Sequence, residues 1–490
     1  MEKLTIWKQR WAALEAMMKA LQVRLASEEL APYVRRPETL QSLLTGLQNF
    51  AQCQFAFLYD GFFDKKFFNL EPFSQNKYSA DYALRVTLNQ IAHDVDLIQR
   101  LTEQGTIARL KGNEQSKLLE TLDKADCLAY AALKPMLRPS EQPLTVLTYF
   151  QKSINIRIIP YAPVVLIGIP ITCRETARDF LAIPHEVGHY LYWYHVVTKQ
   201  EGAQAQIIKK FLDPKPKRFP KPAQNKRGQV YENEPWQAWR EEIFADIYGC
   251  LIGGPVMALS NQALQDQQPA DLFFPTAQSD RMYPFPVARP YIYTQVLKKI
   301  DMVQTGEQLD KHWHAILCNE WGVQVGEQGE LSHPRLTGFD MPGFLTFVDA
   351  MIDRVLPSIA PLSGANQESK RWSDKLPKVD DPAEFLFKQF EDSIAVLDDS
   401  AWPAPGEPTM KPEPDYQPIW VDFLCSRGYQ VGKDIKAAKN LPKNWAELIL
   451  ADAPANSVTP LPFPGRTWEA VVDLDGWTTE GPGSPRATGG

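Results

Sequence analysis

The chain has 490 residues, which is too long for one ordinary domain and predicts two or three. Its hydrophobic fraction of 44% and charged fraction of 23% are those of a globular protein, and they exclude a fibrous, collagen-like or wholly disordered chain. The net charge of -7 offers no electrostatic attraction for phosphates, so we expect no nucleic-acid partner.

The cysteines and the apolar runs bear on the compartment. The 6 cysteines are scattered and form no CxxC pair, which fits free thiols in a reducing compartment. The first residues lack the uninterrupted apolar segment of a signal peptide. The longest apolar runs, Ala162–Ile171 and Tyr248–Leu259, are too short to cross a bilayer of about 30 Å. We therefore expect a cytoplasmic protein without a membrane span.

The first part of the chain, 1–145, predicts an N-terminal helical domain. One apolar helical face is formed near the start by residues at spacings of three and four: Ile6, Trp7, Trp11, Leu14, Met18 and Leu21. Further helices are expected from Pro37 onward, over 82–105 and over 114–137. This region contains no motif with a recognisable chemical role. We expect its helices to restrict the access of substrates or to bind a regulatory protein partner.

The composition changes near Ser153, where a second domain is expected over 146–365. The segment INIRIIPYAPVVLIGIP predicts a short buried or edge strand. Helical patterns resume at 174–180, run past His189 and return at 235–252, with a basic insertion at 199–230 between them. A C-terminal extension follows over 366–490, with a Pro-rich linker and a disordered tail. The fold class is thus α+β and predominantly helical.

The sequence His185-Glu186-Val187-Gly188-His189 has the HExxH pattern. On a helix, residues four apart share a face, so both imidazoles can bind one ion. Glu186 then lies beside that ion, where it can deprotonate a bound water. Gly188 is unfavourable in a helix, which indicates a close approach of another backbone there.

A zinc ion needs a third protein ligand, and the sequence offers two alternatives. Glu242 and Asp246 lie four apart on a later helix, so Glu242 could bind the metal while Asp246 accepts the N–H of a ligand histidine. The rival is His195, which completes a spacing of HExxHxxxxxH like that of the metzincins. Those sequences have glycine at the position of Tyr192, where the chain leaves the helix with positive φ, and a bulky side chain is disfavoured there.

The HEVGH and EIFAD segments together resemble the gluzincin class of zinc metallopeptidases, over roughly 160–250. The resemblance implies a zincin-like metallopeptidase domain with His185, His189 and Glu242 as zinc ligands. It also implies Glu186 as general base and acid, and Asp246 behind a ligand histidine. It further implies that Val164–Ile169 is the edge strand along which an extended peptide pairs. The long basic insertion departs from the class.

Candidates for stabilising the oxyanion follow the second helix. The segment 280–289 resembles the His-Pro…Arg segment of some of these families, with Tyr283 in place of the histidine, so Tyr283 and Arg289 are catalytic candidates. Tyr231, His312 and His314 are other possible donors. His312 and His314 are two apart in a helical pattern and would make a poor chelate.

The sequence thus predicts a hydrolase that cleaves a peptide or protein substrate by metal-assisted attack of water, with Zn²⁺ as cofactor. The alternative is a non-catalytic scaffold or binding protein that retains a structural metal site. Glu186 argues against this alternative, because a structural site has no use for that carboxylate.

Overall fold

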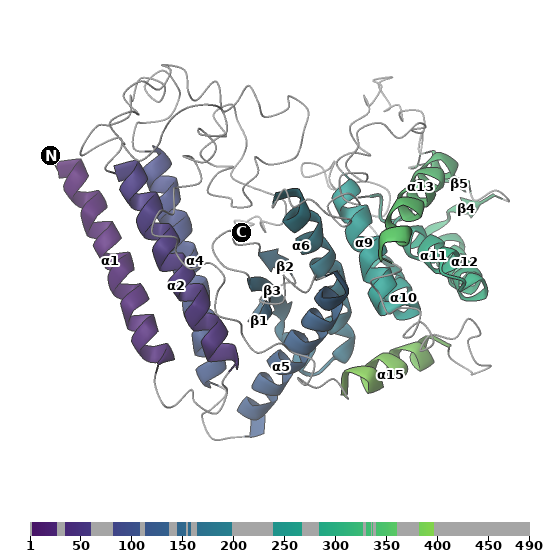
Figure 1. Cartoon of the computed structure of the whole chain (residues 1–490). Coiled ribbons are helices and arrows are strands. Elements are labelled where there is room, and N and C mark those ends of the chain that lie inside the picture. The colour runs from purple at the N-terminus through teal and green to yellow at the C-terminus, as the bar shows by residue number, and fades with distance from the viewer. Residues whose placement is uncertain are drawn as a thin grey trace, which may run out of the picture.

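The computed structural model describes a mostly helical protein with two small sheets, which confirms the predicted fold class at this level (Figure 1). The described residues are 2–26, 35–59, 82–107, 113–136, 145–152, 155–157, 164–197, 239–266, 284–326, 330–334, 336, 340–359 and 382–395. The basic insertion at 199–230 and most of the extension at 366–490 lie outside them, as do Tyr231 and Tyr283.

The N-terminal part is helical, as predicted. Three long helices stand side by side in Figure 1, and a fourth leads to the sheet and ends in a 3-10 turn: α1 (Glu2–Leu25), α2 (Arg35–Leu58), α4 (Tyr82–Ile107), α5 (Asn113–Leu133) and η3 (Lys134–Met136). The apolar spacing read from the sequence explains α1, because Trp7, Trp11 and Met18 are buried. The helices of this region pack through the faces that their sequences make apolar.

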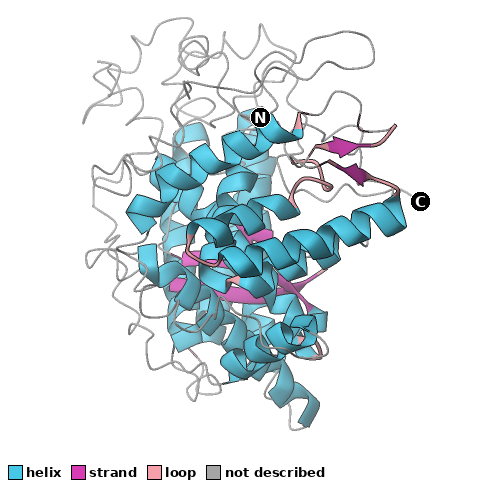
Figure 2. Ribbon diagram, turned by 90° about the vertical axis from the view of Figure 1, so that its right-hand side faces the viewer, coloured by secondary structure: helices cyan, strands magenta, loops and turns pink. Residues whose placement is uncertain are grey.

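The larger sheet has three strands in the order β1-β3-β2: β1 (Thr145–Gln151), β2 (Asn155–Arg157) and β3 (Val164–Pro170). Strand β3 pairs in parallel with β1 and antiparallel with β2, and helices enclose the sheet (Figure 2). The expectation that Val164–Ile169 forms an edge strand is therefore wrong. The physical reason is visible in its composition, since a continuous apolar run suits a central strand that is buried on both faces.

Buried polar contacts attach the N-terminal helices to β1. Nη1 of Arg36 in α2 lies 2.7 Å from Oδ2 of Asp126 in α5, and Arg36 also donates to the carbonyl of Thr148. Oδ1 of Asp126 accepts from the backbone N–H of Thr148 at 2.6 Å. The amide of Gln104 in α4 pairs with both backbone groups of Phe150, at 2.8 and 2.9 Å, and so covers the outer edge of β1.

The rest of the described chain contains the helix with the HExxH pattern, α6, which packs most extensively on α9. Its helices and short strands are η5 (Ile171–Arg174), η6 (Ala177–Ala182), α6 (Ile183–Val197), α9 (Arg240–Gly253), α10 (Pro255–Asp266), α11 (Pro290–Lys299), α12 (Val303–Trp321), β4 (Gln324–Val325), β5 (Leu331–Ser332), α13 (Met341–Ile359) and α15 (Pro382–Ala395). Pro184 lies in the first turn of α6, where its missing N–H is not needed for helical bonding. A turn of 3-10 helix, η6, comes directly before it.

One hydrophobic core runs through regions that the sequence assigns to different domains. It includes Leu133 of α5, Ile167 of β3, Phe244 of α9 and Phe387 of α15. Helix α15, which the sequence analysis did not predict, packs on α10, η6 and α5. The division at 145 and 365 stays a prediction. None of the described helices combines the length and apolar character that crossing a bilayer requires.

Helices α6 and α9 run antiparallel in close contact. A Cβ atom placed on Gly188 of α6 would lie 2.8 Å from Cα of Ala245 in α9 and 3.2 Å from its carbonyl oxygen. One helical turn away, a Cβ on Gly249 would lie 3.4 Å from Cα of His185. Glycine and alanine therefore bring the two backbones together, which is the close approach expected at Gly188.

This contact predicts that Gly188→Ala destabilises the fold. Although alanine is the better helix former, its methyl group would meet the backbone of α9, and such overpacking costs about 1–3 kcal/mol. Chemical denaturation would measure the loss in the free energy of unfolding. Gly105→Ala in α4 is the matched control, because its Cβ would meet only the Arg36 side chain at 3.7 Å. That variant should be up to about 1 kcal/mol more stable; equal effects in both variants would contradict the prediction.

Candidate metal centre

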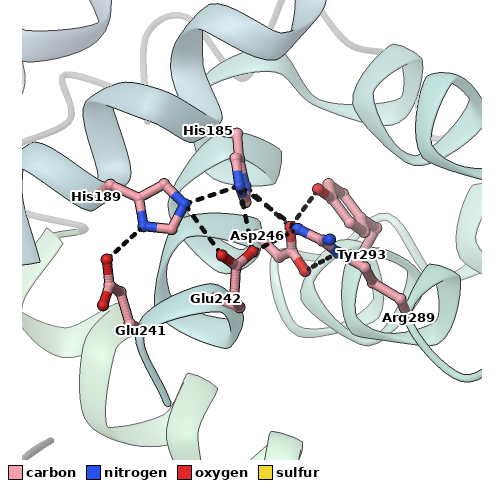
Figure 3. A network of polar contacts seen from close by, with 7 residues as sticks. All are labelled: His185, His189, Glu241, Glu242, Asp246, Arg289 and Tyr293. Carbon is pink, nitrogen blue, oxygen red and sulfur yellow. Dashed lines mark hydrogen bonds and ion pairs between the residues drawn. The ribbon is translucent and has the colours of Figure 1, made fainter. Parts of the chain in front are cut away.

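Three side chains from two helices converge on one point. His185 and His189 lie one turn apart on α6, and Glu242 faces them from α9 (Figure 3). The two Nε2 atoms are 3.1 Å apart. Nε2 of His185 lies 3.5 Å from Oε2 of Glu242, and Nε2 of His189 lies 3.5 Å from Oε1. The structure thus brings together the three residues that the sequence predicted as ligands.

These separations fit three ligands of a single ion. In tetrahedral coordination at about 2.1 Å, neighbouring donor atoms lie about 3.4 Å apart. The side chains of His185, His189 and Glu242 are 14%, 12% and 10% exposed, so their lone pairs face one another with little water to separate them. Such an arrangement is unfavourable unless a cation or a proton lies between the acceptors. The cluster can therefore hold a metal ion.

Each histidine has a carboxylate behind it, on the ring edge opposite Nε2. Nδ1 of His185 lies 2.9 Å from Oδ1 of Asp246, as the sequence analysis expected for a ligand histidine. Nδ1 of His189 lies 2.9 Å from Oε1 of Glu241, a residue to which the sequence analysis gave no role. A proton on Nδ1 leaves Nε2 as the acceptor, so the hydrogen bond of His189 to Glu241 selects the tautomer that a metal needs. The contact of His185 with Asp246 has the distance of an ion pair but not the geometry of a hydrogen bond.

Arg289 connects the carboxylates of the cluster. Its Nε and Nη2 each lie 2.8 Å from an oxygen of Asp246, and Nη2 also lies 2.9 Å from Oε2 of Glu242. Tyr293, one turn further along α11, donates its hydroxyl to Oδ1 of Asp246 at 2.6 Å. Tyr293 was not among the candidates from the sequence, although residues four apart, such as Arg289 and Tyr293, share a face wherever the chain is helical.

Burial and neighbouring charges have opposite effects on the pKa values of the candidate ligands. Burial alone would raise the pKa of Glu242, but the neighbouring histidines and Arg289 hold it below its ordinary value. The same competition lowers the pKa of Asp246, chiefly through Arg289 and His185. Burial lowers the pKa of His189, but Glu242 and the other carboxylates outweigh it and raise this pKa to about 10. Glu242 and Asp246 are therefore ionised at neutral pH.

Glu186 follows the first histidine on α6 and is 9% exposed. Burial raises its pKa, while the charges of His189 and His185 lower it in part, and Glu242 raises it further. Glu186 is therefore within electrostatic reach of the two histidines and Glu242. A carboxyl group with a raised pKa is suited to both accepting and returning a proton.

Of the other candidates, His312 and His314 contact residues outside the cluster. Helix α6 continues through His195 to Val197, so the turn that a metzincin-type third histidine requires does not occur at Tyr192. Among the described residues, the group that could hold a metal consists of His185, His189 and Glu242, and the side chain of His195 lies outside them. Nδ1 of His312 donates to Oε1 of Gln262 at 2.7 Å, and the ring of His314 packs near Tyr291. Tyr283 and Tyr231 lie outside the described residues.

Comparison with known proteins adds no relative. No protein-family model, no curated protein and no solved structure matches the chain. The interpretation of the cluster rests on its own geometry.

Metal binding should release protons and tighten as the pH rises. Because the pKa of His189 is about 10 without metal, the ring is protonated at neutral pH and must lose a proton before Nε2 can bind. The apparent affinity for Zn²⁺ should rise up to about tenfold per pH unit for each proton released. Titration calorimetry in buffers of different protonation enthalpy measures both quantities, and a pH-independent affinity without proton release would contradict this expectation.

The raised pKa of His189 also makes the metal-free fold less stable as the pH rises. A raised pKa stabilises the folded state fully below the ordinary histidine value of 6.5, and this contribution is lost as the pH rises through about 10. Added Zn²⁺ should therefore increase the melting temperature more at alkaline than at neutral pH.

Proposed function

We propose that the protein is a zinc-dependent metallopeptidase that hydrolyses peptide bonds in a peptide or protein substrate. The observation that carries the proposal is the convergence of His185, His189 and Glu242, together with the buried Glu186 that follows His185 on α6. A purely structural site would require a closed set of four ligands and would not need an additional carboxyl group at its edge.

Zinc is the metal that best suits this ligand set. Two imidazoles and one carboxylate in tetrahedral spacing are typical of catalytic zinc sites, which keep their fourth position open. Calcium and magnesium prefer more oxygen ligands than the cluster provides. When bound, zinc would supply a Lewis acid that polarises the substrate carbonyl and makes water more acidic.

The protein side chains would transfer the proton and hold the ligands in place. Glu186 accepts a proton from the attacking water and passes it to the leaving amine, for which its raised pKa is suited. Asp246 and Arg289 keep His185 and Glu242 in place. Arg289 uses Nε and Nη2 for these contacts, so the interaction with the substrate carbonyl that we expect of this residue would involve Nη1.

The sheet offers a place for an extended substrate. Gln104 covers the outer edge of β1, and β3 is central, so neither presents a free edge among the described residues. Strand β2 is antiparallel to β3 and packs against α6, which carries the histidines. We propose that the outer edge of β2 pairs with the substrate backbone.

The decisive variant is Glu186→Gln. It should bind close to one zinc per chain, because the ligands are unchanged, while hydrolysis of a peptide library should fall by about 10²-fold or more with the loss of the general base. Metal analysis and mass spectrometry of the products measure the two effects. The exposed Glu307→Gln in α12 serves as the control and should keep full activity.

Two outcomes would overturn the proposal. Full hydrolysis by Glu186→Gln would remove the mechanism, and zinc binding by the natural sequence without any hydrolysis would favour a structural metal site. A chelator should abolish hydrolysis, and added Zn²⁺ should restore it.

A further inference from the structure

We propose that Glu241 is a positioning residue, which holds the His189 ring so that its Nε2 faces the metal. The inference rests on the proposed metal site and adds to it a residue that the HExxH and ExxAD patterns do not contain. Helix α9 would then provide a carboxylate behind each ligand histidine: Asp246 behind His185, and Glu241 behind His189.

The direction of the contact excludes Glu241 as a ligand. Oε1 of Glu241 lies 2.9 Å from Nδ1 of His189, whereas Nε2 on the opposite edge faces His185 at 3.1 Å and Glu242 at 3.5 Å (Figure 3). Because one ring cannot present both nitrogens to the same ion, Glu241 is behind the ring and Glu242 in front of it. The adjacent carboxylates therefore perform different tasks.

The contact is too well buried to be an ordinary surface ion pair. The side chains of His189 and Glu241 are 12% and 17% exposed, and the pair joins α6 to α9 across 52 positions of the chain. A hydrogen bond to an ionised acceptor in such surroundings restrains the ring far more than one in water. Since the imidazole can rotate about its own side-chain bonds, a fixed acceptor behind it determines where Nε2 points.

The antiparallel packing of α6 and α9 explains how Glu241 reaches His189. The first histidine of α6 meets the later part of α9 at Asp246, and the second meets the earlier part at Glu241 and Glu242. Two adjacent residues on a helix are separated by about 100°, so they can reach the two edges of one ring. Glu241 and Glu242 do so at His189.

The test compares two variants of similar size in the full-length protein. Glu241→Gln keeps an oxygen that accepts from Nδ1–H, whereas Glu241→Met fills the same space without an acceptor. We expect Glu241→Met to bind Zn²⁺ about 10–100-fold more weakly and to release it to a chelator correspondingly faster, as for other residues that support metal ligands. The loss of Zn²⁺ affinity in Glu241→Gln should be clearly smaller than in Glu241→Met. Glu307→Gln, exposed on α12, should match the natural sequence.

A spectroscopic measurement separates positioning from general stability. The visible absorption of Co²⁺ bound in place of zinc reports the coordination geometry. It should change in Glu241→Met and stay the same in Glu241→Gln. If the methionine variant does not fold, Glu241→Ala replaces it with the same expected affinity loss and spectral change. Release of zinc at the natural rate by Glu241→Met, or by Glu241→Ala in its place, would overturn the proposal. Equal losses with glutamine and methionine would also do so, because the charge alone would then explain the effect.

These measurements do not depend on hydrolysis. A chain that binds zinc without cleaving peptides, and that loses zinc faster in Glu241→Met, would contradict the proposed function and support the role of Glu241. A chain that cleaves peptides, and whose zinc affinity is unchanged in Glu241→Met, would support the proposed function and contradict the role of Glu241.

Discussion

The distance between helices α6 and α9 is the constraint on which the site depends. One helix brings the two imidazoles and the other brings the carboxylates, so the spacing of their backbones fixes the spacing of the donor atoms. Gly188 against Ala245 makes this approach possible, because any larger side chain would separate the helices. Because the two helices run antiparallel, successive turns of α6 lie beside successive turns of α9 in reverse order, so His185 contacts Asp246 and His189 contacts Glu242. A small residue in a helix, unfavourable by itself, is thus required for the chemistry.

The site gathers charges that would be costly to bury alone. The carboxylates of α9 are compensated by the histidines, by Arg289 and by the hydroxyl of Tyr293. Nevertheless, the carboxylates around the histidines are numerous enough to raise the pKa of His189 to about 10. This excess of negative charge attracts either protons or a metal cation. The electrostatics that favour a divalent ion are therefore the same ones that make protons its competitor.

The regions outside the HExxH segment support it rather than standing apart. Helix α5 packs on α6 and holds Asp126, whose contacts with Arg36 and Thr148 tie the N-terminal helices to the sheet. Strand β2 packs on α6 from another side, and α15 packs on η6, the turn from which α6 begins. Parts of the chain far apart in sequence thus fix the orientation of one helix. Such support is what a site needs if its ligands are to hold their geometry without the metal.

The sequence by itself determined the features that arise within one helix. The spacing of His185 and His189, and that of Glu242 and Asp246, places each pair on a common face whatever the rest of the fold does. The helical character of the N-terminal region followed from apolar spacing in the same way. Only the tertiary structure brought Glu242 next to the two histidines, placed Glu241 and Tyr293, and showed β3 to be central rather than at an edge. These features depend on which helices and strands pack together in the folded chain, and local periodicity carries no information about such contacts.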